Sequence, residues 1–357
     1  MSTEELSRGA ALAYRALAHQ LDPPARSTAD LAVLGVGVQD TPPGATAHLA
    51  LRARLPAGVQ PSDDDLVLVH SIRGTLHVHR EADLPLLAAA LRPDDARDLL
   101  RPAHGAFFAE AAAAGTAVGD ALDQVSAAMA GVMADRRPRT KGELSTALNE
   151  VVDRRLRPWC AGCGVAHVHD GLFRMASLPA GLVLRQTAKG ATAFHRVEPR
   201  TTQGKPARRQ LLRRFLRLAG PTDHRVLGDW LGITPAAAKR WWSLAGDDLV
   251  PVMVDGTTRA MHADDLAEAR GATPAKTAHL LPPYDPLLAL ADRALLLPDA
   301  AHRRRLWRAV ASPGAVLIEG EIRGTWRRGR GELGVEPFGA LTGAERRLLA
   351  QSKGDAE

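Results

Sequence analysis

The chain has 357 residues, of which 45 % are hydrophobic, and this length and composition predict two to four domains with hydrophobic cores. The apolar share excludes a mainly disordered chain, and two Cys are too few for a disulfide scaffold. The 46 Lys and Arg outnumber 40 Asp and Glu, and only 6 of these cations are Lys. Because Arg makes bidentate contacts with phosphate and guanine, this excess favours a nucleic-acid partner. A GC-rich coding sequence would also raise the Arg count.

Membrane and secretory signals are missing from the sequence. No run reaches the length of about 18 apolar residues that a membrane helix needs. A signal peptide begins with a basic region, but the residues near this N-terminus are acidic. We therefore expect a cytoplasmic protein with no membrane partner. The aromatic share of 4 % argues against a single-strand binder built on many stacking platforms.

Residues 5–94 predict a first winged helix-turn-helix unit, in which three helices precede a β-hairpin. The expected helices are 6–21, a short one that ends at 34, and 45–55, and the expected strands are 66–72 and 75–79. Arg73 and Gly74 form the turn between the strands.

Residues 95–200 predict a second unit of the same kind. Its helical stretches are 107–114, 121–133 and 144–152, and its strand-like stretches are 178–184 and 191–197. Thr140 and Glu143 have the spacing of a capping box at the start of the last helix.

Residues 201–272 predict a third unit, in which Thr234 is the N-cap of the last helix and Pro235 its first residue. The other expected elements are helices 211–218 and 226–232 and the strands 249–254 and 258–261 around an Asp-Gly turn. A small β-rich domain, 273–349, and a frayed tail, 350–357, complete the chain. The fold class is thus α+β: three tandem winged helices and a C-terminal β-rich domain.

Basic residues are clustered near the third unit and in the C-terminal domain. Eight of them lie between Arg196 and Arg217 against one acid, and two smaller groups occur at 303–308 and 323–330. Base composition would scatter Arg instead of gathering it, so the clusters favour DNA binding. The alternative for any one cluster is a solvated linker face.

Several blocks in order resemble the AlkZ-like family of winged-helix DNA glycosylases. They are LGVGVQDTP at 34–42, LALRARL at 49–55, IRGTLH at 72–77, GP at 220–221, DWLG at 229–232, LLPPYDP at 280–286 and GEIRGTW at 320–326. The resemblance implies three winged helices and a β-rich domain around a concave DNA-binding channel. It also implies hydrolysis of the N-glycosidic bond of N7-alkylated or bulky-adduct purines, and in some members the unhooking of interstrand crosslinks.

The resemblance assigns catalysis to a Gln-apolar-Gln motif, or Gln-apolar-Asp in a sister branch. This chain has Gly37-Val38-Gln39, so the second Gln is present and Gly37 replaces the first. We expect Gln39 and Asp40 to be catalytic, with an amide that orients water or a carboxylate that stabilises the oxocarbenium ion. Without the resemblance, a capping amide and an Asx-turn would be the simpler interpretation. If the missing Gln limits activity, restoring it at Gly37 should raise activity.

No Lys lies in a motif for a Schiff base, which predicts a monofunctional enzyme that uses water as its nucleophile. The resemblance also places the first hairpin on DNA. The expected DNA-binding residues are Arg73, Thr75, His77, His79, Arg208, Arg209, Arg213, Arg327 and Arg328. An ordinary hairpin with a solvated His face is the alternative for His79.

Cys160, Cys163, His167 and His169 have ligand types and spacing that suit a structural zinc. Two reduced thiols in a loop are the commoner outcome of such a pattern, and His169-Asp170-Gly171 suits a simple turn. No other cofactor is expected.

Two further functions stay open: a winged-helix duplex-DNA-binding protein without chemistry, either a damage sensor or a transcription regulator, and a protein-interaction module. A regulator usually dimerises, and the sequence has no heptad pattern. We therefore expect a monomer that binds duplex DNA.

Overall fold

The computed structural model describes residues 4–41, 46–100, 106–186, 192–198, 204–290, 292–329 and 332–356. The chain forms two compact units, each assembled from separate stretches of sequence. The first unit is Met1–Ser62, Leu212–Val226 and Ala245–Glu357, and the second is Asp63–Leu211 and Leu227–Leu244. The domain boundaries expected after residues 94, 200 and 272 therefore fall inside these units instead of between them. No helix in the described ranges is long and apolar enough to cross a membrane.

The helices α8 (Gly204–Ala219) and α9 (His224–Leu231) carry the chain between the two units. The second unit also contains β3 (Leu66–His70), β4 (Leu76–Arg80), α3 (Leu84–Leu91), α4 (Ala106–Ala113), α5 (Val118–Val132), α6 (Lys141–Leu148), β5 (Trp159–Cys160), β6 (Val165–Ala166), α7 (Asp170–Ser177), β7 (Leu182–Gln186), β8 (Thr192–Arg196) and α10 (Pro235–Trp242).

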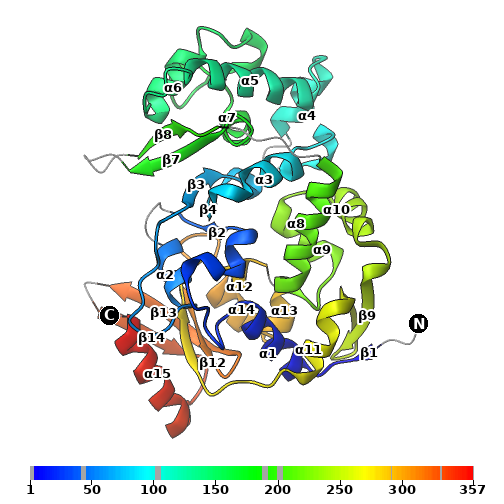
Figure 1. Ribbon diagram of the computed structural model, residues 1–357, viewed down its shortest axis with the longest axis vertical. Coiled ribbons are helices and arrows are strands. Elements are labelled where there is room, and N and C mark those ends of the chain that lie inside the picture. Colours follow the sequence, from blue (N-terminus) through cyan, green and yellow to red (C-terminus); the bar gives the residue numbers. More distant parts are fainter. Residues whose placement is uncertain are drawn as a thin grey trace. The chain divides into compact units, whose positions relative to one another are not determined.

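The core of the second unit lies between its helices and a sheet. Val118, Leu122, Val125 and Met129 recur at helical spacing on α5 and are buried against α7 and the strands. Figure 1 shows α5, α6 and α7 on one side of β7 and β8. The predicted capping box of α6 is confirmed, since the Thr140 hydroxyl and the Glu143 carboxylate each accept a hydrogen bond from the other residue's backbone N–H.

The hairpins of the two expected N-terminal units form one sheet. β4, β3, β7 and β8 lie in that order, and Leu68 pairs with Leu184 where β3 meets β7. Leu68 and Leu76 pack on the same core as α5. The boundary at residue 94 therefore separates parts that share both a sheet and a core, which local periodicity does not reveal.

Residues 169–171 form the start of α7 instead of a simple turn. The His169 ring accepts a hydrogen bond from the Gly171 N–H, and Leu172, Phe173 and Ala176 are buried at helical spacing. The following strand, β7, accordingly begins at Leu182, four residues later than the apolar run suggests.

The first unit contains two sheets of its own. Its elements are β1 (Glu4–Glu5), α1 (Arg8–Ala18), β2 (Val38–Gln39), α2 (Ala47–Arg52), β9 (Leu249–Val254), β10 (Thr257–His262), α11 (Leu266–Gly271), β11 (Ala278–Leu281), α12 (Pro286–Ala289), α13 (Arg293–Leu296), α14 (Ala300–Leu306), β12 (Gly314–Ile318), β13 (Glu321–Gly329), β14 (Glu332–Pro337) and α15 (Gly343–Ala356). β1 joins the β9–β10 hairpin in parallel with β9, and β11–β14 form an antiparallel sheet in chain order.

The C-terminal region differs from the expected β-rich domain with a frayed tail. α12, α13 and α14 occupy much of 286–306, and residues 350–356 are the last turns of α15. Leu349 of α15 is buried with Val316, Ile318 and Trp326 of the adjacent sheet (Figure 1). This apolar contact keeps the polar end of the chain helical, because it anchors the helix against the sheet.

A buried ion pair joins Arg54, two residues after α2, to the C-terminal part of the first unit. The guanidinium of Arg54 donates to both carboxylate oxygens of Asp285 at 2.7 and 2.8 Å, and neither side chain has exposed surface. Arg54 also donates to the Ala50 carbonyl of α2 at 2.6 Å and to His19 at 3.3 Å. His19 donates in turn to Leu218 of α8, so one guanidinium connects four segments.

His19 has to be neutral in this network, because its Nδ1 accepts the hydrogen bond from Arg54. Burial, reinforced by the charge of Arg54, holds the pKa of His19 well below its ordinary value of 6.5. The imidazole therefore accepts from the guanidinium without adding a second positive charge.

We predict that Arg54→Met lowers the free energy of unfolding by about 3–5 kcal/mol, because it leaves the Asp285 carboxylate buried without its counter-ion. Urea denaturation followed by circular dichroism measures the change. Arg97→Met is the matched control, since the Arg97–Asp95 pair is exposed and exposed pairs contribute less than about 1 kcal/mol. Equal losses in both variants would contradict a structural role of the buried pair.

Candidate active site and DNA-binding residues

The candidate catalytic residues lie on the connection between a short 3₁₀ helix, Ala32–Gly35, and α2. Gly37 has φ +93°, a conformation open to Gly and strained for other residues. Val38 and Gln39 form β2, and Gln39 and Asp40 are 8 % and 4 % exposed. Pro42, the last residue of the resemblance block, lies outside the described residues. The two candidate catalytic side chains are thus polar groups buried inside the first unit.

Asp40 is bound to the N-terminus of α2. Its Oδ1 accepts hydrogen bonds from the backbone N–H groups of Thr46 and Ala47, both at 3.0 Å, and lies 3.4 Å from the Thr46 hydroxyl. These amides are among the helix donors that have no partner within the helix. A carboxylate there is stabilised by the hydrogen bonds and by the helix dipole. The side chain of Asp40 therefore anchors the loop to α2.

Thr46 is a site residue that the sequence analysis missed. Its hydroxyl donates to the main-chain carbonyl of Gln39 at 2.9 Å and accepts from the N–H of Thr41 at 3.2 Å. A Thr one residue before a helix, following an Asp six positions earlier, is a signal that could have been recognised. Together Asp40 and Thr46 fix the backbone on both sides of Gln39.

The side chain of Gln39 has partners different from those of Asp40. Its Nε2 donates to the Thr41 hydroxyl at 3.5 Å, at the long limit of a hydrogen bond. Since this contact uses the amide nitrogen, it orients Nε2 toward Thr41 while the main chain is held by Thr46. The arrangement presents a neutral amide from a fixed backbone.

Arg214 of α8 reaches the same connection within the first unit. It donates to the Gly35 carbonyl at 3.2 Å, and a Cβ on Gly35 would come within 3.1 Å of its side chain. Gly35 therefore permits a close approach between the 3₁₀ helix and α8. This contact adds a second support on the N-terminal side of Gln39.

The turn of the first hairpin is held inside the second unit. Arg73 has φ +54° and donates to the carbonyls of Trp230 at 2.9 Å and Asp229 at 3.4 Å, near the end of α9. Gly232 makes room for it, since a Cβ there would lie 2.8 Å from Arg73 Cγ. The half-buried guanidinium thus stabilises the C-terminus of a helix. Thr75 is also half-buried and donates to Ile72.

His77 and His79, both expected to bind DNA, lie on a buried face of β4, and the alternative of a solvated face for His79 does not match the structure. Their exposed fractions are 4 % and 0 %. His77 hydrogen-bonds the Thr75 carbonyl at 3.1 Å and His79 the Ser71 hydroxyl at 2.9 Å, and these partners permit burial of the polar rings. Burial, with His79 nearby, holds the pKa of His77 well below 6.5.

Two of the expected DNA-binding cations are engaged in ion pairs. Arg208 pairs with Asp94 and donates to Ala90 at the end of α3, while Arg213 pairs with Asp264 and Asp265 at 3.2 and 2.9 Å. The sequence showed eight basic residues against one acid because these acids lie elsewhere in the chain. Clustering in sequence therefore overstates the net positive charge around α8.

Three expected DNA-binding residues lie in exposed positions: Arg209 on α8, and Arg327 and Arg328 on β13. Arg327 donates to the Ala311 carbonyl at 2.7 Å. Exposed guanidiniums suit phosphate contacts.

The second unit contains a cavity of about 250 Å³ that the sequence analysis missed. Arg73, Arg208, Trp241 and His70 line it together with aliphatic side chains. The Arg208 guanidinium lies 5.5 Å from the Trp241 ring centroid, and burial lowers the pKa of His70 to about 4. No local sequence pattern indicates this cavity, because its lining comes from separate elements.

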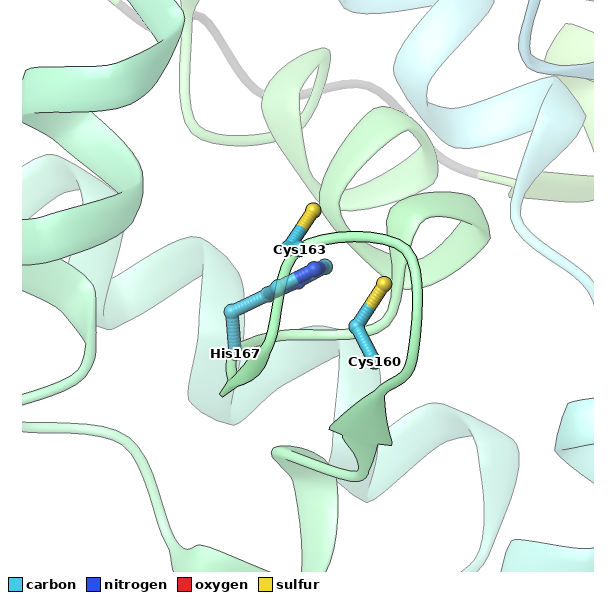
Figure 2. Close-up of side chains that lie close together, drawn as sticks. All are labelled: Cys160, Cys163 and His167. Carbon is cyan, nitrogen blue, oxygen red and sulfur yellow. The ribbon is translucent and has the colours of Figure 1, made fainter.

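Cys160, Cys163 and His167 come together on the β5–β6 hairpin (Figure 2). Their ligand atoms lie within 4.8 Å of one another. The hydrogen bond from the backbone N–H of Cys163, together with the adjacent His167 ring, lowers the pKa of Cys160 to about 7. His169, the fourth expected ligand, is separate from this group: it caps α7 and stacks on Phe107 at 4.0 Å.

The chain has a mixed α+β fold. Comparison with known proteins identifies it as a DNA glycosylase. The chain belongs to the AlkZ-like DNA glycosylase family, whose model matches residues 33–356. The DNA glycosylase AlkZ of Streptomyces sahachiroi has a similar structure, with a TM-score of 0.77 at 20 % identity over 98 % of this chain and 96 % of that chain. No curated protein matches. Family membership implies a hydrolase of N-glycosyl bonds that acts in DNA repair.

We predict that Gly37→Gln lowers the free energy of unfolding by about 1–2 kcal/mol and leaves base excision no faster, because a side chain is strained at this φ. This reverses the sequence-based expectation that restoring Gln raises activity. Urea denaturation and an excision assay check it. Gly142→Ala, at an exposed position of α6 with nothing near a Cβ, is the matched control and should not destabilise. A Gly37→Gln protein that is as stable as the wild type and faster would contradict the argument.

Proposed function

We propose that this protein is a monofunctional DNA glycosylase that hydrolyses the N-glycosidic bond of N7-alkylated or bulky-adduct purines, including purines in interstrand crosslinks. The observation that carries the proposal is the nearly buried loop in which Asp40 and Thr46 fix the backbone around the neutral amide of Gln39. Family membership gives the reaction class, and this loop gives a group suited to it.

The protein does not need to activate the leaving group strongly, because N7-alkylation leaves a positive charge on the purine. When the bond between C1′ and the purine N9 breaks, its electron pair returns to the base and neutralises that charge. Water then bonds to C1′ of the oxocarbenium-like sugar and loses a proton to solvent. A neutral amide can hold this water through its carbonyl oxygen and favour attack by position alone. We assign this role to Gln39.

We assign Asp40 a positioning role instead of a catalytic one. Its Oδ1 is occupied by two backbone N–H groups of α2, and this contact holds the residue that follows Gln39. The anchoring contact is the direct inference from the geometry.

We further propose that the chain binds duplex DNA as a monomer through three winged-helix units and a C-terminal domain. Support comes from the recurring order of helices followed by a hairpin, clearest in α5, α6, α7, β7 and β8. Arg73, Thr75, Arg209, Arg327 and Arg328 are the residues we assign to phosphate contacts. His77 and His79 would support the hairpin from its buried face.

A second candidate function is DNA binding without chemistry, as in a damage sensor or a transcription regulator. Gly37 favours it, since this residue stands where the family motif has its first Gln. The two functions differ in whether an abasic site forms.

We predict that the wild-type protein converts N7-methylguanine or nitrogen-mustard-crosslinked duplex DNA to abasic sites, and that Gln39→Ala slows this step by about 10²-fold or more. Alkaline cleavage of the product on a gel measures it. Gln124→Ala, on the exposed face of α5, is the matched control and should retain full activity.

Absence of product with the wild type, together with duplex binding that weakens steeply with salt, would favour the second function. A covalent complex trapped by borohydride would contradict the assignment of water as the nucleophile.

A further inference from the structure

We propose that Cys160, Cys163 and His167 form a Zn²⁺ site on the β5–β6 hairpin, with a fourth coordination position open to solvent. The proposal is independent of base excision. Among the residues that the structure describes, these three form a group with metal-ligand spacing. Figure 2 shows the ring of His167 pointing between the two sulfur atoms.

The backbone between the two Cys has a tight turn that presents both thiols to the same point. The N–H groups of Cys163 and Gly164 donate to the Cys160 carbonyl at 3.2 and 2.9 Å. Gly164 has φ +67°, which allows the chain to reverse directly after the second Cys. A turn closed in this way places two ligands that are separated by two residues on one side of the hairpin, as metal-binding Cys pairs require.

His167 is oriented as a metal ligand by its other ring nitrogen. Its Nδ1 lies 2.8 Å from the Val168 carbonyl, which can only accept, so Nδ1 carries the proton. Nε2 then keeps its lone pair for a metal ion. A backbone carbonyl that fixes the tautomer in this way is the usual second partner of a metal-bound His.

The three ligand atoms are close to the spacing that zinc needs. Zn–S bonds of about 2.3 Å and Zn–N bonds of about 2.0 Å place tetrahedral ligands about 3.5–3.8 Å apart. The observed limit of 4.8 Å is therefore about 1 Å larger, a difference that side-chain rotation can close. Two thiolates and one imidazole are donors that favour Zn²⁺ over hard cations.

The hairpin has little else to hold it together. β5 and β6 contribute two residues each, and residues 158–166 include no buried side chain. Trp159 and Val165 are 69 % and 50 % exposed. An isolated two-stranded hairpin is marginal in water, so a metal clip accounts for a defined turn without a core.

His169 is excluded from the ligand set. Its Nδ1 accepts from the Gly171 N–H at the start of α7, and its ring stacks on Phe107. Cys163 is exposed, so water can complete the coordination. The site therefore has three protein ligands instead of the four that the sequence suggested.

The test is metal analysis of the full-length protein purified under reducing conditions from zinc-supplemented medium. We expect about one zinc per chain, and a sulfur-to-cobalt charge-transfer band when Co²⁺ replaces zinc. Cys160→Ser, Cys163→Ser and His167→Ala should each lose the metal at least tenfold more readily to a weak chelator. Hydrogen exchange should rise over residues 158–167 in these variants and stay unchanged in α5, which shows that the unit still folds.

His169→Asn is the matched control, because Asn keeps an acceptor for the Gly171 N–H but removes the imidazole. We expect it to retain zinc and the cobalt band. Metal-free protein with no cobalt band, or a Cys160–Cys163 disulfide in place of metal, would overturn the proposal. Loss of zinc in His169→Asn with retention in His167→Ala would overturn the ligand set.

Discussion

The buried contact between Arg54 and Asp285 is the interaction on which the candidate site depends. One guanidinium, with no exposed surface, binds a carboxylate, the carbonyl of Ala50 and the ring of His19. It thereby fixes α2 within the first unit. Because Asp40 is bound to the first N–H groups of α2, the position of that helix sets the position of the loop. The same contacts, from Arg54 through α2 to Asp40, fix the position of Gln39, which directly precedes Asp40 in the chain.

This arrangement suits a reaction whose leaving group is already activated. The alkylated purine that we propose as the substrate carries its own positive charge, so the protein would gain little from a strong acid or base. It gains more from holding a water molecule in one place, since fixed dipoles need no rearrangement as charge develops. A neutral amide on an anchored backbone can do this, and the family to which the chain belongs catalyses glycosidic hydrolysis in DNA.

Local features of the fold could be predicted from the sequence, and long-range ones could not. The α6 capping box, the β3–β4 and β9–β10 hairpins and the Thr234 N-cap depend on residues a few positions apart. The shared sheet depends on the contact between Leu68 and Leu184, which no local pattern indicates. The same limit explains the interleaved units, whose boundaries follow packing instead of sequence order.

The candidate site shows the same division. Gln39 is a candidate that the motif alone indicates, but the anchoring role of Asp40 requires knowing that α2 begins beside it. His77 and His79 alternate with apolar residues, a pattern that fits a solvated His face as well as the observed buried one. Arg208 and Arg213 looked like free cations because Asp94 and Asp265 are distant in sequence. Charge clusters therefore indicate DNA contacts only after their internal ion pairs are known.

The central claim is that Asp40 positions Gln39 through hydrogen bonds and not through its charge. Single-turnover excision rates of Asp40→Asn and Asp40→Ala test it directly, because Asn keeps the oxygen that accepts from α2 and loses the charge. We predict a rate within about fivefold of wild type for Asn, the size of a helix-terminus charge effect, and a much larger loss for Ala. An Asn variant as slow as the Ala variant would contradict the account and make the carboxylate itself catalytic.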